Sequence, residues 1–147
     1  MTNEADFSTL GLSEQMLEAV RAKGFETPTS IQRLTIPRLL SGGNDIIAQS
    51  QTGTGKTAAF GLPILQQTEH SADGVQALVL VPTRELAVQA AEELLSFNAG
   101  RRLSITAIYG GAAMSEQLRR LSRGVDIVVG TPGRVLDHIR RGTMKLE

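Results

Sequence analysis

The chain has 147 residues and no cysteine, which excludes disulfides, thiol catalysis and cysteine-based metal sites. Lysine and arginine together number 15, as do aspartate and glutamate, so the formal net charge is zero. Proteins that hold nucleic acid by bulk charge are usually basic, so a nucleic-acid contact here would have to be local. The 41% hydrophobic content and the lack of an apolar run of about 20 residues predict one soluble, cytoplasmic domain with a core.

Two helices are predicted within the first 44 residues. Ser13 is a plausible N-cap for the first helix, and Gly24 ends it. The second helix begins at Thr29, where Thr29 and Gln32 fit the spacing of a capping box. Pro37 is expected to kink this helix or to end it early, because proline removes a helical hydrogen bond.

From residue 45 onward, strand-like runs alternate with helical patterns. The runs are nearly continuous in β-branched and aliphatic residues, as expected for parallel strands that are buried on both faces. The repeating strand–helix order predicts an α/β fold of three layers around a mostly parallel sheet. The predicted plan is an N-terminal arm with two helices at 1–44 and an α/β domain at 45–147. The four predicted strands cover 45–49, 77–81, 105–109 and 125–129.

The stretch from Ser50 to Thr57 follows the first predicted strand and has the pattern of a phosphate-binding loop. Gly53 and Gly55 let the backbone curl close to a phosphate, and the amides at the helix start point toward the anion. Lys56 can reach the β- and γ-phosphates, and the Thr57 hydroxyl can bind Mg²⁺. Ser50 stands where the usual pattern begins with glycine. The alternative is a glycine-containing turn between strand and helix that binds nothing.

The other predicted strands are also followed by distinctive loops. These are the segments 82–87, 110–111 and 130–134. In open parallel sheets, ligands bind at the carboxyl ends of the strands. The loops are therefore expected to form one continuous rim with the phosphate loop.

Taken together, these segments resemble the first RecA-like domain of DEAD-box RNA helicases. Phe7 and the run Gly24 to Gln32 resemble the family's Q motif, and Ser50 to Thr57 resembles motif I. The segments 82–87, 110–111 and 131–134 resemble motif Ia, the Gly-Gly motif and motif Ib. The resemblance implies a RecA-like P-loop fold and RNA-stimulated ATP hydrolysis that is coupled to local unwinding of an RNA duplex. It also implies ATP, Mg²⁺, an RNA strand and a second RecA-like domain as partners.

The resemblance assigns functional residues to both ligands. Lys56 and Thr57 would be catalytic, and Thr57 would bind Mg²⁺. The nucleotide-binding residues would be Phe7, Phe25, Thr27, Gln32, Gln51, Thr52, Gly53, Thr54, Gly55, Lys56, Thr57 and Ala58. The RNA backbone would contact Pro82, Thr83, Arg84, Gly110, Gly111, Thr131, Pro132, Gly133 and Arg134. Backbone contacts carry no sequence information, so RNA binding is expected to be independent of sequence.

Several of these residues also have a structural interpretation. The Gln32 side chain either closes the capping box at Thr29 or contacts adenine, and both can hold in different nucleotide states. Thr131 and Pro132 are ordinary residues for a helix start. Lone histidines at 70 and 138 have no partners at metal-binding spacing and receive no predicted role.

The chain ends at Glu147, before the Asp-Glu-Ala-Asp and Ser-Ala-Thr motifs and the second RecA-like domain that the resemblance would place next. The resemblance therefore implies that these 147 residues hold a nucleotide but hydrolyse ATP negligibly. Two other interpretations stay open. The chain could be a non-catalytic nucleotide- or RNA-binding module, or part of another P-loop NTPase such as a DNA helicase.

Overall fold

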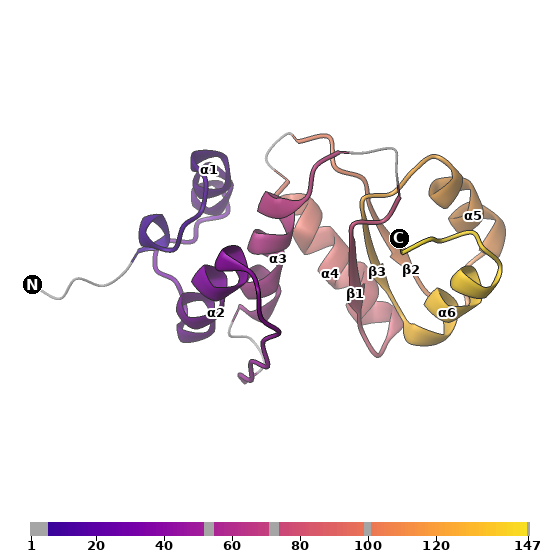
Figure 1. The fold of residues 1–147 in the computed structure, drawn as a ribbon, viewed down its shortest axis with the longest axis horizontal. Coiled ribbons are helices and arrows are strands. Elements are labelled where there is room, and N and C mark those ends of the chain that lie inside the picture. Colours follow the sequence, from indigo (N-terminus) through magenta and orange to yellow (C-terminus); the bar gives the residue numbers. More distant parts are fainter. Residues whose placement is uncertain (1–5, 52–54, 71–73, 99–100, 147) are drawn as a thin grey trace, which may run out of the picture. The chain divides into compact units, whose positions relative to one another are not determined.

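The computed structural model describes residues 6–51, 55–70, 74–98 and 101–146 (Figure 1). Their contacts divide them into two compact units. The first, called the helical unit, holds the described residues of 1–67 and 96–100. The second, called the sheet unit, holds those of 68–95 and 101–147. Each unit is described by itself.

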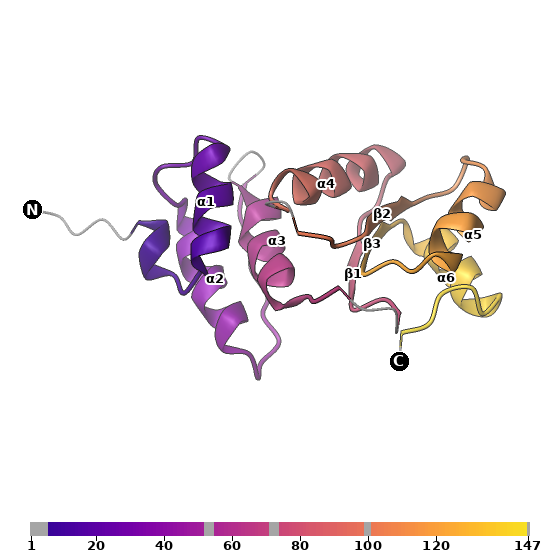
Figure 2. The ribbon, with the colours of Figure 1, turned by 90° about the horizontal axis from the view of Figure 1, so that it is seen from above.

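The helical unit consists of short helix η1 (Phe7–Thr9) and helices α1 (Glu14–Ala22), α2 (Ser30–Ser41) and α3 (Lys56–Gln67). The Ser13 side chain accepts a hydrogen bond from the Met16 amide, which confirms the predicted N-cap of α1. Helices α2 and α3 pack side by side, as Figures 1 and 2 show. The unit's most deeply buried side chains include those of Met16, Val20, Ile36, Leu62 and Leu65.

Pro37 was predicted to kink the second helix or to end it early. It does not end the helix early, because α2 continues to Ser41. Proline removes one hydrogen bond to the carbonyl four residues earlier, here that of Arg33, which lies on the exposed side of the helix. Tertiary contacts hold the rest of α2 in place. Ile36 is fully buried, and the Thr35 hydroxyl contacts the Ala59 carbonyl of α3 at 3.5 Å.

The predicted first strand, 45–49, is also wrong for this structure, because the segment has no strand conformation. A strand needs a neighbour for its backbone hydrogen bonds, and none of the strands in the described residues pairs with this segment. Ile47 and Ala48 are consequently exposed, whereas Ile46 is half-buried. Ile47 is 101% exposed.

The sheet unit contains three parallel strands: β1 (Ala77–Leu80), β2 (Ile105–Ile108) and β3 (Ile127–Gly130). Their order is β1-β3-β2, with Val79 and Ala107 both in register with Val129. Helix α4 (Arg84–Ser96) lies on one side of the sheet, and α5 (Met114–Ser122) and α6 (Pro132–Arg140) lie on the other (Figures 1 and 2). The predicted α/β class, with three layers and a parallel sheet, is confirmed.

The core of the sheet unit is built around β3, whose four residues are all buried. Val128 belongs to a buried cluster with Ile108 of β2 and Val135 of α6. Because side chains alternate along a strand, Ile127 and Val129 face the opposite side, toward the layer of α4. Gly130 leaves room for α6. A Cβ at this position would lie 2.4 Å from Cγ2 of Val135 and 3.0 Å from the Ile108 carbonyl oxygen.

A buried carboxylate fixes the amino ends of the strands. The Asp126 side chain, which is 1% exposed, accepts hydrogen bonds from the Ser104 amide at 2.9 Å and from Gln76 Nε2 at 3.3 Å. His70 Nδ1 lies 3.1 Å from the same carboxylate. His70, which has no predicted role, therefore contributes to the start of the sheet.

His138 is the most deeply buried ionisable side chain of α6, with 0% exposure. Its Nδ1 atom lies 2.8 Å from the Thr143 hydroxyl, and its Nε2 atom lies 3.1 Å from Gln117 Oε1. Burial lowers the pKa of His138, and the nearby positive charge of Arg134 lowers it further. The imidazole is therefore neutral near pH 7.

The Gly130→Ala variant should lose about 1–3 kcal/mol of unfolding free energy, because the added methyl group forces Val135 or the strand itself to move. Urea denaturation followed by circular dichroism measures this loss. Gly133→Ala is the matched control, since a Cβ there meets no atom within 4 Å. Equal losses in both variants would contradict the packing argument.

The stability of the chain should also depend on the protonation of His138. The folded-state pKa lies below the unfolded value of 6.5, so the unfolded chain binds more protons between these two values. This contribution to stability is fully present above pH 6.5 and decreases as the pH falls toward the folded-state pKa. Urea midpoints from about pH 7.5 to 5.5 measure it. The His138→Gln variant should show a flatter profile, and an unchanged profile would exclude His138 as the source.

Candidate functional site

The phosphate loop leads directly into a helix, as its pattern predicts. Helix α3 begins at Lys56, immediately after Gly55, whose φ of +81° lies in the region that favours glycine. The Lys56 side chain is exposed, and Thr57 is half-buried in the first turn. Three other predicted residues, Thr52, Gly53 and Thr54, lie outside the described part of the chain.

Gln32 joins α2 to this loop. Its Oε1 accepts the Thr29 amide at 2.9 Å and its own amide lies 3.4 Å from the Thr29 hydroxyl, so the predicted capping box is confirmed. On its other side, Nε2 donates to the Gly55 carbonyl at 3.3 Å. A Cβ on Gly55 would lie 2.3 Å from Nε2, so a side chain there would displace the Gln32 amide. The side chain is 2% exposed, and its contact with adenine stays a prediction.

An aromatic cluster lies elsewhere in the helical unit. The rings of Phe7 and Phe25 stack with centroids 6.4 Å apart, and Phe25 meets the edge of Phe97 at 5.5 Å. Phe7 and Phe25 line a cavity of about 420 Å³, whose walls do not include Gln32. Phe7 is 4% exposed, so its ring is buried in the helical unit. Among the other nucleotide candidates, Thr27 and Gln51 are exposed and Ala58 is buried.

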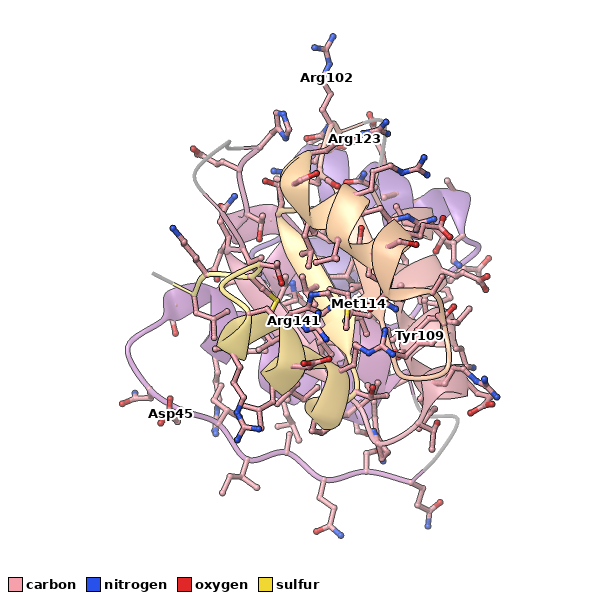
Figure 3. The ribbon with its side chains drawn as sticks, turned by 90° about the vertical axis from the view of Figure 1, so that its right-hand side faces the viewer. Asp45, Arg102, Tyr109, Met114, Arg123 and Arg141 are labelled. Carbon is pink, nitrogen blue, oxygen red and sulfur yellow. The ribbon has the colours of Figure 1, made fainter. Side chains whose placement is uncertain are left out.

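The predicted RNA-binding residues lie in the sheet unit, at the carboxyl ends of its strands. Backbone hydrogen bonds join these ends: the Val81 amide donates to the Gly130 carbonyl at 3.0 Å, and the Thr131 amide donates to the Ile108 carbonyl at 3.0 Å. Three of the four predicted loops therefore share one edge, which we call the sheet rim (residues 82–84, 110–112 and 131–134). Figure 3 shows that Arg102 and Arg123 lie at the end of this unit away from Tyr109, which precedes the 110–112 loop.

Arg84 and the Gly-Gly loop meet at the rim. Gly111 has a φ of +83°, and a Cβ there would lie 3.2 Å from Arg84 Nη1. Thr83 caps α4, because its hydroxyl accepts the Leu86 amide at 3.2 Å. The carboxylate of Glu85 lies 3.5 Å from Arg84. A hydrogen bond from its own backbone amide lowers the pKa of Glu85, and the charge of Arg84 lowers it further.

The start of α6 forms the third part of the rim. Pro132 occupies the first turn, and the Thr131 side chain makes no capping hydrogen bond. Arg134 reaches across to the Gly-Gly loop, where Nη1 donates to the Ala112 carbonyl at 3.3 Å. The same nitrogen donates to Gln117 Oε1 at 3.2 Å. Pro82, Thr83, Gly110, Gly111, Pro132 and Gly133 are exposed, whereas Thr131 and Arg134 are half-buried.

Sequence reasoning missed Gln117, which contacts the rim residue Arg134, and His138, which contacts Gln117. Gln117 Nε2 donates to the Tyr109 carbonyl at 2.9 Å, directly before the Gly-Gly loop. His138 Nε2 lies 3.1 Å from Gln117 Oε1. Gln117 stands in an ordinary polar position of an amphipathic helix, so periodicity alone gives no sign of its burial.

The chemistry of the first turn of α3 fits Mg²⁺ that arrives with a nucleotide. Mg²⁺ prefers oxygen ligands, keeps several waters and is commonly held by one side-chain oxygen together with phosphates. The Thr57 hydroxyl suits this role. Within the described residues, no group of three or more His, Cys, Asp or Glu side chains is placed to hold a metal ion. In the same residues, no helix has both the length and the apolarity needed to span a membrane.

Comparison with known proteins identifies close relatives. The chain is 50% identical over 141 residues to the ATP-dependent RNA helicase CshA of Listeria monocytogenes. The aligned region covers 96% of this chain and 27% of that protein. The chain is also 54% identical over 149 residues to the RNA helicase CrhR of a Synechocystis species, covering 100% of this chain and 30% of that protein. The chain thus spans less than a third of the length of these relatives.

Solved structures agree with the sequence relatives. A DEAD box protein from Methanococcus jannaschii has a TM-score of 0.91 and 47% identity over 96% of this chain and 38% of that one. A Saccharomyces cerevisiae Dbp5 variant bound to RNA and ADP BeF3 has a TM-score of 0.85 and 36% identity over 96% of this chain and 35% of that one. The family model described as DEAD/DEAH box helicase matches residues 29–147. The chain therefore belongs to the DEAD/DEAH box helicase family.

Proposed function

We propose that the chain is part of the first RecA-like domain of a cytoplasmic ATP-dependent RNA helicase. In this proposal, residues 1–44 form the arm and Q-motif helices, and residues 45–147 form a partial RecA-like domain. The chain binds ATP with Mg²⁺ and the backbone of one RNA strand, and a second RecA-like domain is its partner. The names of the CshA and CrhR relatives, both RNA helicases, support this proposal.

One observation carries the RNA side of the proposal. Arg84 and Arg134 come from the starts of two different helices. Arg134 donates to the Ala112 carbonyl, and Arg84 Nη1 lies where a Cβ on Gly111 would come within 3.2 Å of it. Two cations and the amides of two helix starts thereby lie around an exposed glycine pair, where no side chain blocks a phosphate. A neutral protein can bind RNA through such a local cluster, and contacts of this kind position a strand without reading its bases.

The helical unit supplies the chemistry for the nucleotide. Backbone amides at the start of α3 can donate to phosphate oxygens, and Lys56 is exposed at that helix start. The Thr57 hydroxyl would hold Mg²⁺ that arrives with the nucleotide, and the ion would supply positive charge beside the phosphates. Gln32 connects this loop to α2, so the residue proposed to recognise the base also touches the phosphate loop.

In the whole protein, we propose RNA-stimulated ATP hydrolysis coupled to the opening of short RNA duplexes. Phosphoryl transfer of this kind depends on positioning and charge stabilisation. Nucleotide and RNA can favour a closed arrangement of two RecA-like domains only if both bind it better than the open one. Hydrolysis then removes that preference and releases the strand.

The adenine assignment predicts a specific effect of Gln32→Glu. The variant keeps the Oε1 acceptor of the capping box but loses the amide donor, so affinity for ADP with Mg²⁺ should fall about 5- to 100-fold. Isothermal titration with ADP and GDP measures both the loss and the base preference. Gln66→Glu is the control, because the Gln66 side chain makes the same two kinds of contact with other partners. Its oxygen accepts from the Ser13 amide, and its nitrogen donates to the Gly11 carbonyl. Equal affinity of the unchanged chain for ADP and GDP would refute the assignment.

The RNA assignment predicts that Arg84→Ala and Arg134→Ala each weaken binding of a labelled single-stranded RNA by about 3- to 10-fold, because each loses a phosphate contact. Fluorescence anisotropy at several salt concentrations measures this effect, with oligonucleotides of two unrelated sequences. The exposed Arg140 of α6 provides a control with the same change of charge. A loss of similar size in Arg140→Ala would show that bulk charge is responsible.

A further inference from the structure

Gln117 is the only side chain of α5 that is buried, with 5% exposure. The apolar residues of this helix, Met114, Leu118 and Leu121, are only half-buried. A buried amide that merely filled space would be costly, because polar groups lose their hydrogen bonds to water on burial. The most deeply buried residue of α5 therefore contributes through its hydrogen bonds and not through apolar packing.

The bonds of Gln117 define the orientation of its amide group. Nε2 faces the Tyr109 carbonyl, which can only accept, so this atom is the donor. Oε1 then accepts from Arg134 Nη1 at 3.2 Å. His138 Nε2, at 3.1 Å from the same oxygen, must also carry a proton and donate.

The rest of the His138 ring agrees with this arrangement. With the proton on Nε2, the neutral ring accepts at Nδ1, 2.8 Å from the Thr143 hydroxyl. This tautomer requires the single hydroxyl proton to point to Nδ1 in preference to the His138 carbonyl, which lies 3.1 Å from the same oxygen. The ring is fully buried, so its orientation is fixed by packing as well as by these two bonds. His138 therefore holds Gln117 Oε1 at the position where Arg134 meets it.

The Gly-Gly loop is fastened on both sides by this network. Gln117 holds the carbonyl of Tyr109 before the two glycines, and Arg134 holds the carbonyl of Ala112 after them. Long arginine side chains lose conformational freedom when they bind a ligand, and an arginine that is already ordered loses less. The same bonds thus order the turn and one of the cations beside it.

We propose that Gln117 and His138 are positioning residues that hold Arg134 and the Gly110–Gly111 turn ready for the RNA backbone. The proposal rests on the RNA-binding function proposed for the sheet rim. Neither residue touches RNA in this proposal. His138 acts through Gln117, and Gln117 acts on Arg134 and, through the Tyr109 carbonyl, on the turn.

A double-mutant cycle tests this coupling. Gln117→Met, which has a similar shape but cannot form these bonds, should weaken binding of a short labelled oligouridine by about 3- to 10-fold. In an Arg134→Ala background, the same change should weaken binding by a smaller factor than in the unchanged chain, since the part of the effect that passes through Arg134 is gone. Fully additive losses would show that Gln117 supports the fold without positioning Arg134.

Side-chain NMR gives a second measurement that does not depend on RNA. The Nε–H signal of Arg134 should report an ordered side chain in the unchanged chain and a mobile one in Gln117→Met. If Arg134→Ala weakens RNA binding while Gln117→Met does not, only this inference is overturned. If Arg134→Ala binds as tightly as the unchanged chain, the proposed function fails at that residue and the inference fails with it.

Two histidine variants separate hydrogen bonding from packing. His138→Gln keeps a donor near the position of Nε2, so its RNA affinity should stay within about twofold of that of the unchanged chain. His138→Leu has no donor, so its loss of RNA affinity should equal that of Gln117→Met. Urea midpoints confirm that both variants are folded. Equal losses in the two would exclude the histidine donor as a positioning element.

Discussion

The close packing of α6 against the central strand is the constraint on which the sheet unit depends. Gly130 ends β3 without a side chain, so Val135 and the Ile108 carbonyl can occupy the space that a Cβ would fill. The chain then turns at once into α6, which brings Arg134 to the edge where β2 also ends. Because all three strands are parallel, the loops that follow them meet at that edge. The RNA-binding residues proposed here are thus neighbours for a reason of topology.

Most of the fold could be predicted from the sequence where local pattern and tertiary packing agree. The aliphatic runs of β1, β2 and β3 and the caps at Ser13 and Thr29 are examples, since each signal lies within a few residues. The prediction failed where the outcome depends on distant partners. The run 45–49 has the composition of a strand but lacks a neighbouring strand among the described residues. Helix α2 continues past Pro37 because it packs against α3.

The candidate site shows the same division. Gly55 has a strong local signal, because it stands in the pattern of a phosphate-binding loop. Arg84 and Gly111 were assigned through the family resemblance of their loops. Gln32 is the intermediate case: its cap is a local pattern, whereas its bond to Gly55 links residues 23 positions apart. Gln117 and His138 could not be predicted, since their importance arises only when α5, α6 and the end of β2 are brought together.

The contacts of Arg134 also determine how many hydrogen bonds it has left to offer. A guanidinium carries five N–H groups, two of them on Nη1. Both hydrogens of Nη1 point inward, one to Ala112 and one to Gln117. The three that remain belong to Nε and Nη2, and those two nitrogens form the edge that grips two oxygens of one phosphate side by side. If Arg134 binds the RNA backbone as proposed, these inward bonds leave Nε and Nη2 as the pair of donors for a single phosphate group, whereas lysine would offer that phosphate only a point charge.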